Sequence, residues 1–332
     1  MAATIYDLVR ESGISLATVS KYLNGKKVKD STAKKIDEAV ARINYIPNGI
    51  ARSLVTSKTK TVGVLLPFIA NEFCSEIVQF FAAEMRANGY AILIGDCGMK
   101  KINEESVARF LLEKKVDAMF SMPLSDHSTL AAFCNAYHIP IVFVDHYLDN
   151  NQGDIIISDN KQATFDATQK LLSMGHRKIA MIGSDSFIGM AERTDGYYQA
   201  LYQSPDSTAI EKDLYINGYD FDGSYRAMKK LWETRHPTAV ICGSYNMTLG
   251  ALYYLQESGI CLGKDISFIG FDSLSLTKMI YPRITTIEQQ CDKIGIAAAQ
   301  LLIRRMNGDM SDFPRLERIP TAFHQTESIR SI

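Results

Sequence analysis

Several residues able to contact a ligand stand directly after short apolar segments that are typical of buried β-strands. Parallel α/β sheets bind ligands beyond the carboxyl ends of their strands, so such residues are candidates for one shared cleft. An acidic residue after a strand is also a common turn residue, so each carboxylate taken singly has a structural interpretation as well. The set comprises Phe68, Asp145, Ser244, Tyr245 and Asp272.

No motif for catalysis or for a cofactor accompanies these residues. The segment 259–265 has a spacing similar to a phosphate-binding loop, but it is one residue short, ends in Asp and lies between a helix and a strand. No Gly-x-Gly-x-x-Gly motif follows a strand, and the six histidines form no His-Glu-x-x-His pattern. We therefore expect a ligand-binding protein that is not an enzyme and uses neither a cofactor nor a metal.

The segments that would position the candidate residues alternate between strand and helix. Strands are predicted at 61–67, 91–95, 118–122, 141–145, 178–182, 239–243 and 266–271. Helices are predicted at 72–88, 104–115, 160–174, 192–202 and 247–258. Repeated β–α units form parallel sheets with helices on both faces. Because about 270 residues exceed the usual extent of one such sheet, we expect two doubly wound parallel sheets.

The first 46 residues predict three short helices. Thr4 can cap the first helix, with Asp7 placed three residues on for a capping box, and a Ser-Gly pair ends that helix. The second helix covers 16–23, and Asp30 or Ser31 can cap the third. This pattern is typical of an all-α helix-turn-helix domain, although a small three-helix bundle of another purpose would share it.

The second helix of a helix-turn-helix enters the major groove of DNA. Lys21 can reach a guanine edge or a phosphate, whereas Leu16 and Ala17 can contact a thymine methyl group. Small hydroxyl side chains let the helix approach the phosphates closely. The outward residues are Leu16, Ala17, Thr18, Ser20 and Lys21.

Charge is unevenly distributed along the chain. Residues 1–60 contain eleven Lys and Arg against five acidic residues, a net charge of +6 in a chain whose total is −1, which leaves −7 on the remainder. A basic N-terminal segment on an acidic body favours a module that binds a polyanion such as DNA, although a solvated basic face has the same composition.

Short motifs in the first 54 residues indicate one family. They are Ile5-Tyr6-Asp7-Leu8, Gly13-Ile14-Ser15, Thr18-Val19-Ser20-Lys21, Leu23-Asn24, Asn44-Tyr45-Ile46-Pro47-Asn48 and Ala51-Arg52-Ser53-Leu54. This set closely resembles the headpiece of the lactose/galactose repressor family of bacterial transcription regulators, and the resemblance runs through essentially the whole chain. It implies sequence-specific binding to operator DNA, with Asn24 added to the contacts of the second helix.

In that family the stretch after the Tyr-x-Pro-Asn motif is a hinge helix that folds only on operator DNA. Asn48 can cap such a helix, which at about two turns is too short to be stable alone. The resemblance implies that Ala51 and Arg52 also contact the operator. It further implies that Leu54 inserts into the minor groove, where an apolar wedge unstacks a base step and kinks the duplex.

The resemblance also implies a two-lobed body similar to the periplasmic sugar-binding proteins, with three crossing strands and a ligand in the cleft between the lobes. Asp145, Arg193 and Asp272 match the family's polar ligand contacts. Two carboxylates and a guanidinium suit the hydroxyl groups of a sugar. Phe73, Phe187 and Phe221 fall at or near positions that line the family's pocket, and they join Phe68 and Ser244 from the strand-end rule. Gln289, beside the chain's return to the first lobe, is a further candidate.

One departure from the family bears on the identity of the effector. The family often has Ala-Asn-Asp after the strand at 239–243, whereas this chain has Ser244-Tyr245-Asn246. Asp145 and Asp272 disfavour an anionic ligand through like-charge repulsion. We therefore expect a neutral sugar, with a nucleobase or a phosphorylated metabolite as the alternative.

The expected function is a repressor of carbohydrate-utilisation genes. So small a headpiece requires a twofold-symmetric homodimer on a pseudo-palindromic operator. An effector switches such a dimer when its affinity differs between two arrangements of the lobes. The expected parts are a helix-turn-helix domain at 1–46, a hinge helix and linker at 47–60, an N-terminal lobe at 61–158 with 290–320, and a C-terminal lobe at 159–289 with 321–332.

Two other protein classes share some of these features. A stand-alone sugar-binding protein has the same two lobes but needs an export signal and has no basic headpiece, and an enzyme on a doubly wound fold needs a catalytic constellation. No apolar run approaches the roughly 20 residues of a membrane span, and the N-terminus has no signal-like pattern. The six separated cysteines are expected to be buried free thiols. We therefore expect a cytoplasmic protein.

Overall fold

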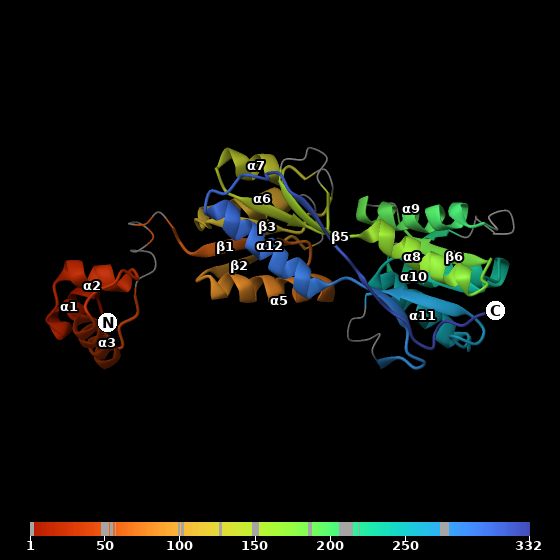
Figure 1. Ribbon diagram of the computed structural model, residues 1–332, viewed down its shortest axis with the longest axis horizontal. Coiled ribbons are helices and arrows are strands. Elements are labelled where there is room, and N and C mark those ends of the chain that lie inside the picture. Colours follow the sequence, from red (N-terminus) through yellow and green to blue (C-terminus); the bar gives the residue numbers. More distant parts are fainter. Residues whose placement is uncertain are drawn as a thin grey trace. The chain divides into compact units, whose positions relative to one another are not determined.

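The computed structural model describes residues 3–47, 53, 56, 58–98, 100, 103–125, 128–147, 153–184, 188–205, 215–218, 220–272 and 279–332. The chain divides into two compact units, Met1–Thr59 and Lys60–Ile332, which we call the headpiece and the body (Figure 1). In the part of the chain that the structure describes, no helix is both long and apolar enough to cross a membrane.

The headpiece contains the three predicted helices, α1 (Ile5–Ser12), α2 (Leu16–Leu23) and α3 (Asp30–Ile43). Each helix contributes to one small core, and a hydrogen bond from the Tyr22 hydroxyl to Asp37 Oδ1 (2.7 Å) ties α2 to α3. Because the three helices share this core, the orientation of α2 is set by packing. The buried core residues are Leu8, Val19, Ile36, Ala39 and Tyr45.

The ends of the headpiece helices follow their local sequence. The predicted capping box is confirmed, since Asp7 N donates to Thr4 Oγ1 (3.3 Å) and Thr4 N donates to Asp7 Oδ2 (3.0 Å). The prediction that Asp30 or Ser31 caps α3 is wrong, because the helix already begins at Asp30 and extended Lys29 occupies the cap position. Asp30 instead lies in the first turn, where a carboxylate interacts favourably with the helix dipole.

The body contains two six-stranded sheets, as predicted. We call the first sheet, with the helices that cover it, the N-lobe. Its strand order is β11-β5-β4-β3-β1-β2, and all of its strand pairs are parallel. The strands are β1 (Thr61–Leu66), β2 (Ala91–Asp96), β3 (Ala118–Ser121), β4 (Ile141–Val144), β5 (Asp154–Ser158) and β11 (Leu316–Ile319).

The second sheet, with its helices, forms the C-lobe. Its order is β12-β10-β9-β8-β6-β7, and its pairs are parallel apart from the antiparallel pair of β10 with β12. The strands are β6 (Ile179–Gly183), β7 (Tyr215–Asn217), β8 (Ala239–Cys242), β9 (Ser267–Phe271), β10 (Thr285–Glu288) and β12 (Ala322–His324).

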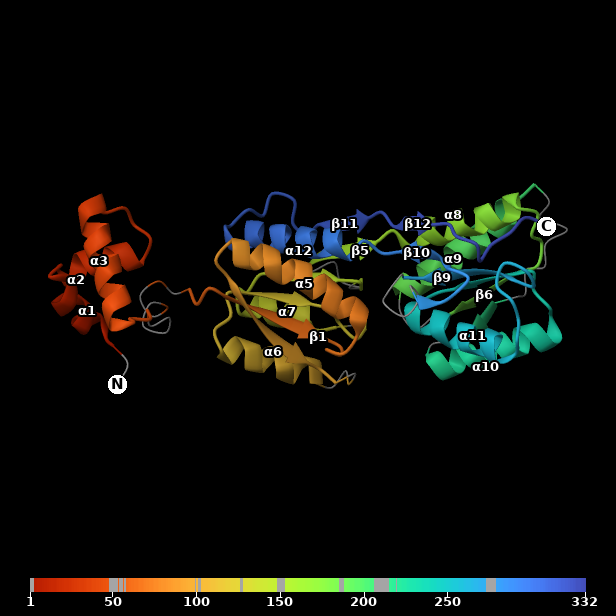
Figure 2. The ribbon, with the colours of Figure 1, turned by 90° about the horizontal axis from the view of Figure 1, so that it is seen from below.

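Helices cover both faces of each sheet. On the N-lobe, α5 (Glu72–Ala87) and α12 (Cys291–Met306) pack on one face, with α6 (Asn103–Glu113) and α7 (Leu130–Ala136) on the other. On the C-lobe, α8 (Asn160–Ser173) and α9 (Ile188–Gln203) lie opposite α10 (Phe221–Thr234) and α11 (Tyr245–Glu257), as Figure 2 shows. Each lobe therefore has a three-layer core in which the sheet is buried on both sides.

The chain passes between the two lobes three times, after β5, after β10, and between β11 and β12 (Figure 2). The lobe segments are thereby interleaved along the sequence, since α12 and β11 return to the N-lobe after the C-lobe sheet is nearly complete. The hydrophobic pattern did not predict β5, β7, β10, β11, β12, α7, α10 or α12.

Two glycines allow helices to approach each other closely at the carboxyl ends of the sheets. A Cβ at Gly196 of α9 would lie 2.1 Å from Lys161 O of α8, and a Cβ at Gly295 of α12 would lie 2.5 Å from Ile77 O of α5. No larger residue fits at either position without moving a backbone. The contact at Gly196 holds the start of α8 against the middle of α9, within one turn of Arg193.

Five of the six cysteines are buried free thiols, as expected. Cys261 is exposed, so the expectation is wrong for this residue. It lies in the turn between α11 and β9 and not within a strand.

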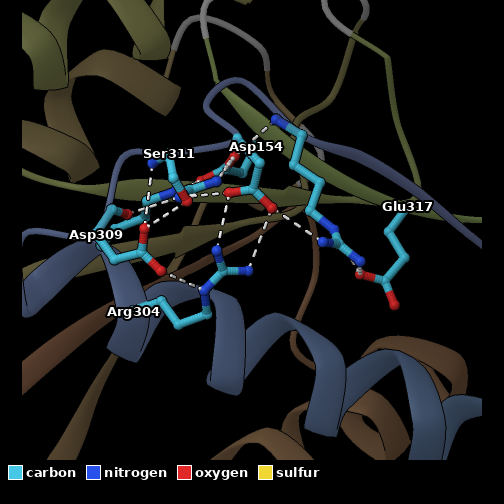
Figure 3. Close-up of polar contacts among 8 residues, drawn as sticks. Asp154, Arg304, Asp309, Ser311 and Glu317 are labelled. Atoms are coloured by element: carbon cyan, nitrogen blue, oxygen red, sulfur yellow. Dashed lines mark hydrogen bonds and ion pairs between the residues drawn. The ribbon is translucent and has the colours of Figure 1, made fainter.

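A network of ion pairs fastens the segment after α12 to the start of β5 (Figure 3). Arg305 binds Asp154 through two hydrogen bonds, Nε to Oδ2 (2.7 Å) and Nη2 to Oδ1 (2.9 Å), and both side chains are buried. Arg315 N also donates to Asp154 Oδ1 (2.9 Å). Asp312 and Glu317 pair with the more exposed arginines around this buried centre.

We predict that Asp154→Ala lowers the free energy of unfolding by about 3–5 kcal/mol, because it leaves the buried Arg305 guanidinium without its main partner. Glu317→Ala, which removes an outer member of the same network, is the matched control and should cost less than about 1 kcal/mol. Urea unfolding followed by circular dichroism measures both. Equal, small losses for the two variants would contradict the importance of the buried pair.

Candidate functional site

Two carboxylates stand at the carboxyl ends of the two sheets, Asp145 after β4 and Asp272 after β9. Both residues have a left-handed backbone, with φ of 67° and 64°. Each N–H donates to the neighbouring strand, Asp145 N to Ile156 O (3.1 Å) and Asp272 N to Ile287 O (2.7 Å). Since non-glycine residues seldom adopt positive φ, the turn at each strand end is imposed by the surrounding structure and aims the carboxylate away from the strand direction.

Arg193 of α9 lies at the same edge of the C-lobe sheet and is almost fully buried. Its Nε donates to Asn160 Oδ1 (2.7 Å), and its Nη1 donates to Gly243 O (2.6 Å). The guanidinium carbon lies 3.7 Å from the centre of the Phe271 ring, a cation–π distance. Nη2 makes no hydrogen bond to any described residue, so the fixed guanidinium keeps one donor group for a ligand.

The electrostatics place Arg193 close to both carboxylates. Burial lowers the pKa of Arg193, and the charges of Asp272 and then Asp145 oppose that shift. Burial likewise raises the pKa of Asp272 to about 6, against the charge of Arg193 and the hydrogen bonds from Gln289. The structure therefore brings together the three polar residues that the sequence suggested, with Asp145 contributed by the N-lobe and the other two by the C-lobe.

Gln289 holds Asp272 in position. Its Nε2 donates to both carboxylate oxygens of Asp272 (3.2 Å each), while its Oε1 accepts from Ser158 Oγ (2.8 Å). Its backbone N–H also donates to Asp272 Oδ1 (3.3 Å). Since both ends of the amide are engaged, the structure gives Gln289 a positioning role between two crossing segments. Its contact with an effector stays a prediction.

The aromatic candidates are placed differently from one another. Phe68, in the loop after β1, is exposed, whereas Phe73 packs partly against the N-lobe core. The Phe221 ring lies 5.7 Å from the Tyr253 ring, so it packs against α11. Phe187 lies outside the described residues.

Ser244 caps α11, since its Oγ accepts from Met247 N (3.3 Å). Its hydroxyl oxygen therefore already accepts one hydrogen bond from the helix backbone. Tyr245, the first residue of α11, follows it at the carboxyl end of β8.

Sequence reasoning missed Asn160, which lies at the centre of the site. It is fully buried, its Oδ1 accepts from Arg193, and its Nδ2 has no hydrogen-bond partner among the described residues. The strand-end rule would have found it, because Asn160 follows β5 closely, but β5 itself was not predicted. The Gly243 carbonyl and the Phe271 ring were missed because a backbone atom and a core aromatic carry no polar signal in the sequence.

The outer face of α2 is open for contact with DNA. Leu16, Ala17 and Lys21 are exposed, and Thr18 and Ser20 are half-buried. The Asn24 side chain donates to Ser20 O (2.8 Å) and so also closes the end of α2. Four of the predicted DNA contacts lie outside the described residues, namely Asn48, Ala51, Arg52 and Leu54.

Two known protein families match the chain. Residues 4–48 match the bacterial regulatory proteins of the lacI family, and residues 168–329 match the periplasmic binding protein-like domain. The chain is 33% identical to catabolite control protein A of Priestia megaterium over 94% of this chain and 95% of that protein. It is 32% identical to the transcriptional repressor PurR of Vibrio atlanticus over 92% of both.

The chain belongs to the lacI family. Like the family members it matches, it is a DNA-binding transcription regulator that responds to a small ligand, and it is not an enzyme.

Solved structures of lacI-family regulators have the same fold. The Lac repressor dimer bound to operator and the anti-inducer ONPF matches with a TM-score of 0.86 at 23% identity, covering 99% of this chain and 100% of that chain. The complex of the transcriptional regulator CelR with cellobiose matches with a TM-score of 0.73 at 25% identity, covering 98% and 99%.

We predict that Asp272→Asn becomes more stable relative to the wild type as the pH rises from about 4 to about 6, with no further change above that range. A buried carboxyl with a raised pKa stabilises the fold when protonated, and that stabilisation is lost as the pH rises and the carboxyl ionises. Asparagine does not ionise, so the variant does not lose stability in this way. Urea unfolding at several pH values measures the difference.

Asp195→Asn, on the exposed face of α9, is the matched control. It removes one carboxylate from the helix that carries Arg193 and leaves the buried site intact. A pH-independent difference for Asp272→Asn as well would contradict the inferred burial of an ionisable charge.

Proposed function

We propose that this regulator is a repressor whose effector is a neutral sugar bound between the lobes. The observation that carries the proposal is the group of Asp145, Arg193 and Asp272 at the carboxyl ends of the two sheets, with an unused donor on Arg193. Carboxylates accept hydrogen bonds from adjacent hydroxyls, and a guanidinium donates to a hydroxyl or ring oxygen.

Two further observations support a polyol. Beside Arg193, Asn160 Nδ2 is buried without a hydrogen-bond partner in the part of the chain that the structure describes, so it offers a second donor at the same place. The exposed ring of Phe68 offers an apolar face for a sugar ring. The complex of CelR with cellobiose shows that a protein similar over nearly the whole chain binds a sugar.

The net negative charge of the site disfavours an anionic effector. Asp145 and Asp272 together outnumber the single positive charge of Arg193, so a phosphorylated metabolite would meet net repulsion. A nucleobase carries no such charge and remains the alternative for the same site.

We further propose that the effector acts through the angle between the lobes. A ligand that contacts Asp145 on one lobe and Arg193 on the other favours the arrangement in which both contacts are made. A coupling of roughly 1–3 kcal/mol suffices to change operator affinity usefully. On this proposal the parts are the helix-turn-helix at 1–46, the hinge at 47–60 and the two lobes of 61–332, acting as a homodimer in the cytoplasm on genes for carbohydrate use.

We predict that intact protein selects a pseudo-palindromic duplex from a random DNA pool, and that Leu54→Ala abolishes this selection while non-specific binding at low salt is retained. The wedge supplies sequence-dependent deformation, whereas the basic headpiece supplies the non-specific attraction. Binding measured over a series of salt concentrations separates the two. Equal loss of both modes for Leu54→Ala would contradict the wedge.

We predict that one sugar of a panel that also contains nucleobases raises the melting temperature of the protein and changes its operator affinity. Arg193→Lys should weaken that ligand by about 10- to 100-fold, because a charge-assisted hydrogen bond and the planar stacking on Phe271 are lost. Arg109→Lys, on the exposed face of α6, is the control and should leave affinity unchanged. Binding of a nucleobase alone would overturn the sugar assignment but leave the site in place.

A further inference from the structure

Three side chains form a polar contact between the lobes beside the candidate site. Glu192 of α9 accepts two hydrogen bonds from Arg318 of β11, Nη2 to Oε1 (2.7 Å) and Nη1 to Oε2 (3.2 Å). The Tyr147 hydroxyl donates to Glu192 Oε1 (3.0 Å). Since α9 belongs to the C-lobe, whereas Tyr147 follows β4 and β11 completes the N-lobe sheet, the three residues span the two lobes. We call them the inter-lobe latch.

The geometry of the latch is specific. Both oxygens of Glu192 are engaged by the two terminal nitrogens of Arg318, the paired arrangement in which arginine binds carboxylates most directionally. Arg318 also lies over the Tyr147 ring, with its guanidinium carbon 5.5 Å from the ring centre. The Glu192 side chain is 17% exposed and that of Arg318 is 36% exposed, so the pair is reached by solvent ions from one side.

The latch adjoins the effector contacts of both lobes along the chain. Glu192 directly precedes Arg193, and Tyr147 is two residues beyond Asp145. A change in the distance between Glu192 and Tyr147 therefore accompanies a change in the distance between Arg193 and Asp145. The latch joins the same two segments that an effector would bridge.

We propose that Glu192 is a positioning residue, whose bonds to Arg318 and Tyr147 set the angle between the lobes and thereby the separation at which Asp145 and Arg193 hold an effector. The link to effector affinity rests on the proposed function. The control of the lobe angle does not rest on it, and is testable with no effector present.

The strength of the inter-lobe latch should depend on salt concentration. A partly exposed ion pair is screened by salt more than the fully buried contacts of Arg193 and Asp272 are. The latch is therefore the part of the cleft that weakens first as the salt concentration rises.

The test measures the distance between the lobes directly. Spin labels are placed by Ala87→Cys on α5 and Arg226→Cys on α10, both exposed, in a Cys261→Ser background that removes the one exposed native thiol. Labelled chain is mixed with excess unlabelled chain, so that each dimer holds at most one labelled protomer. Pulsed electron paramagnetic resonance then gives the distribution of distances in the full-length protein.

We predict that Glu192→Gln and Arg318→Gln each shift the equilibrium between lobe distances by about two- to fivefold relative to the wild type. Raising the salt from about 0.05 M to about 1 M should shift the wild type in the same direction and leave both variants nearly unchanged. The exchange of both residues, Glu192→Arg with Arg318→Glu, should move the distribution at low salt back toward that of the wild type, although incompletely, because Asp159, 4.0 Å from Arg318, would then face a second carboxylate.

Glu105→Gln is the matched control, because it removes an ion pair (Glu105 Oε1 to Arg109 Nη2, 3.0 Å) that lies within α6 alone. It should leave the distance distribution unchanged. Thermal unfolding of every variant checks that the body is folded. Should Glu192→Gln fail to fold, the exchanged pair and the salt series still decide the question.

Wild-type distances in both single variants, or distances in the wild type that do not respond to salt, would overturn the proposal. The sugar panel is run afterwards on the same proteins. A latch that controls the distance while no sugar binds would refute the proposed effector and leave the latch standing. Sugar binding together with wild-type distances in both single variants would refute the latch and leave the proposed effector standing.

Discussion

Arg193 carries a buried positive charge, and the arrangement of the candidate site follows from the contacts that stabilise this charge. A buried guanidinium is stable only when its donors and its charge are matched. Asn160 and the Gly243 carbonyl accept two of its hydrogen bonds, the Phe271 ring covers one face, and the field of Asp272 offsets its charge. These partners come from three elements, so the start of α8 and the ends of β8 and β9 are held around one group.

The polar contacts that stabilise Arg193 extend through Asp272 to the segments that cross between the lobes. Asp272 is itself destabilised by burial, and Gln289 stabilises it while accepting from Ser158 at the end of β5. The polar chain from Arg193 to Ser158 thus runs into two of the three segments that join the lobes.

The fold class, together with Asp145 and Asp272, was predictable because it depends on repeated local patterns, whereas Arg193 was predicted only through the family resemblance. Buried parallel strands are continuous apolar runs, and the rule that ligands bind at their carboxyl ends selected Asp145 and Asp272 directly. Short edge strands such as β7 and β12 have little apolar pattern and were missed. Asn160 was missed because β5, which precedes it, was not predicted. The contacts of Gln289 and Phe221 depend on which side chains the fold brings next to them, and a local sequence pattern does not contain that information.

The interleaving of the lobes also constrains how the chain is made. One face of the N-lobe sheet is covered by α12, whose buried residues Ile294, Ala298 and Leu302 join the core beneath α5. Ribosomes deliver β1–β5 long before this helix, so the part of the face that α12 covers stays exposed while the chain from α8 to β10 is being synthesised. A nascent chain that stops before α12 therefore has an incomplete N-lobe with exposed apolar surface, and the C-lobe sheet is completed later still, when β12 pairs with β10.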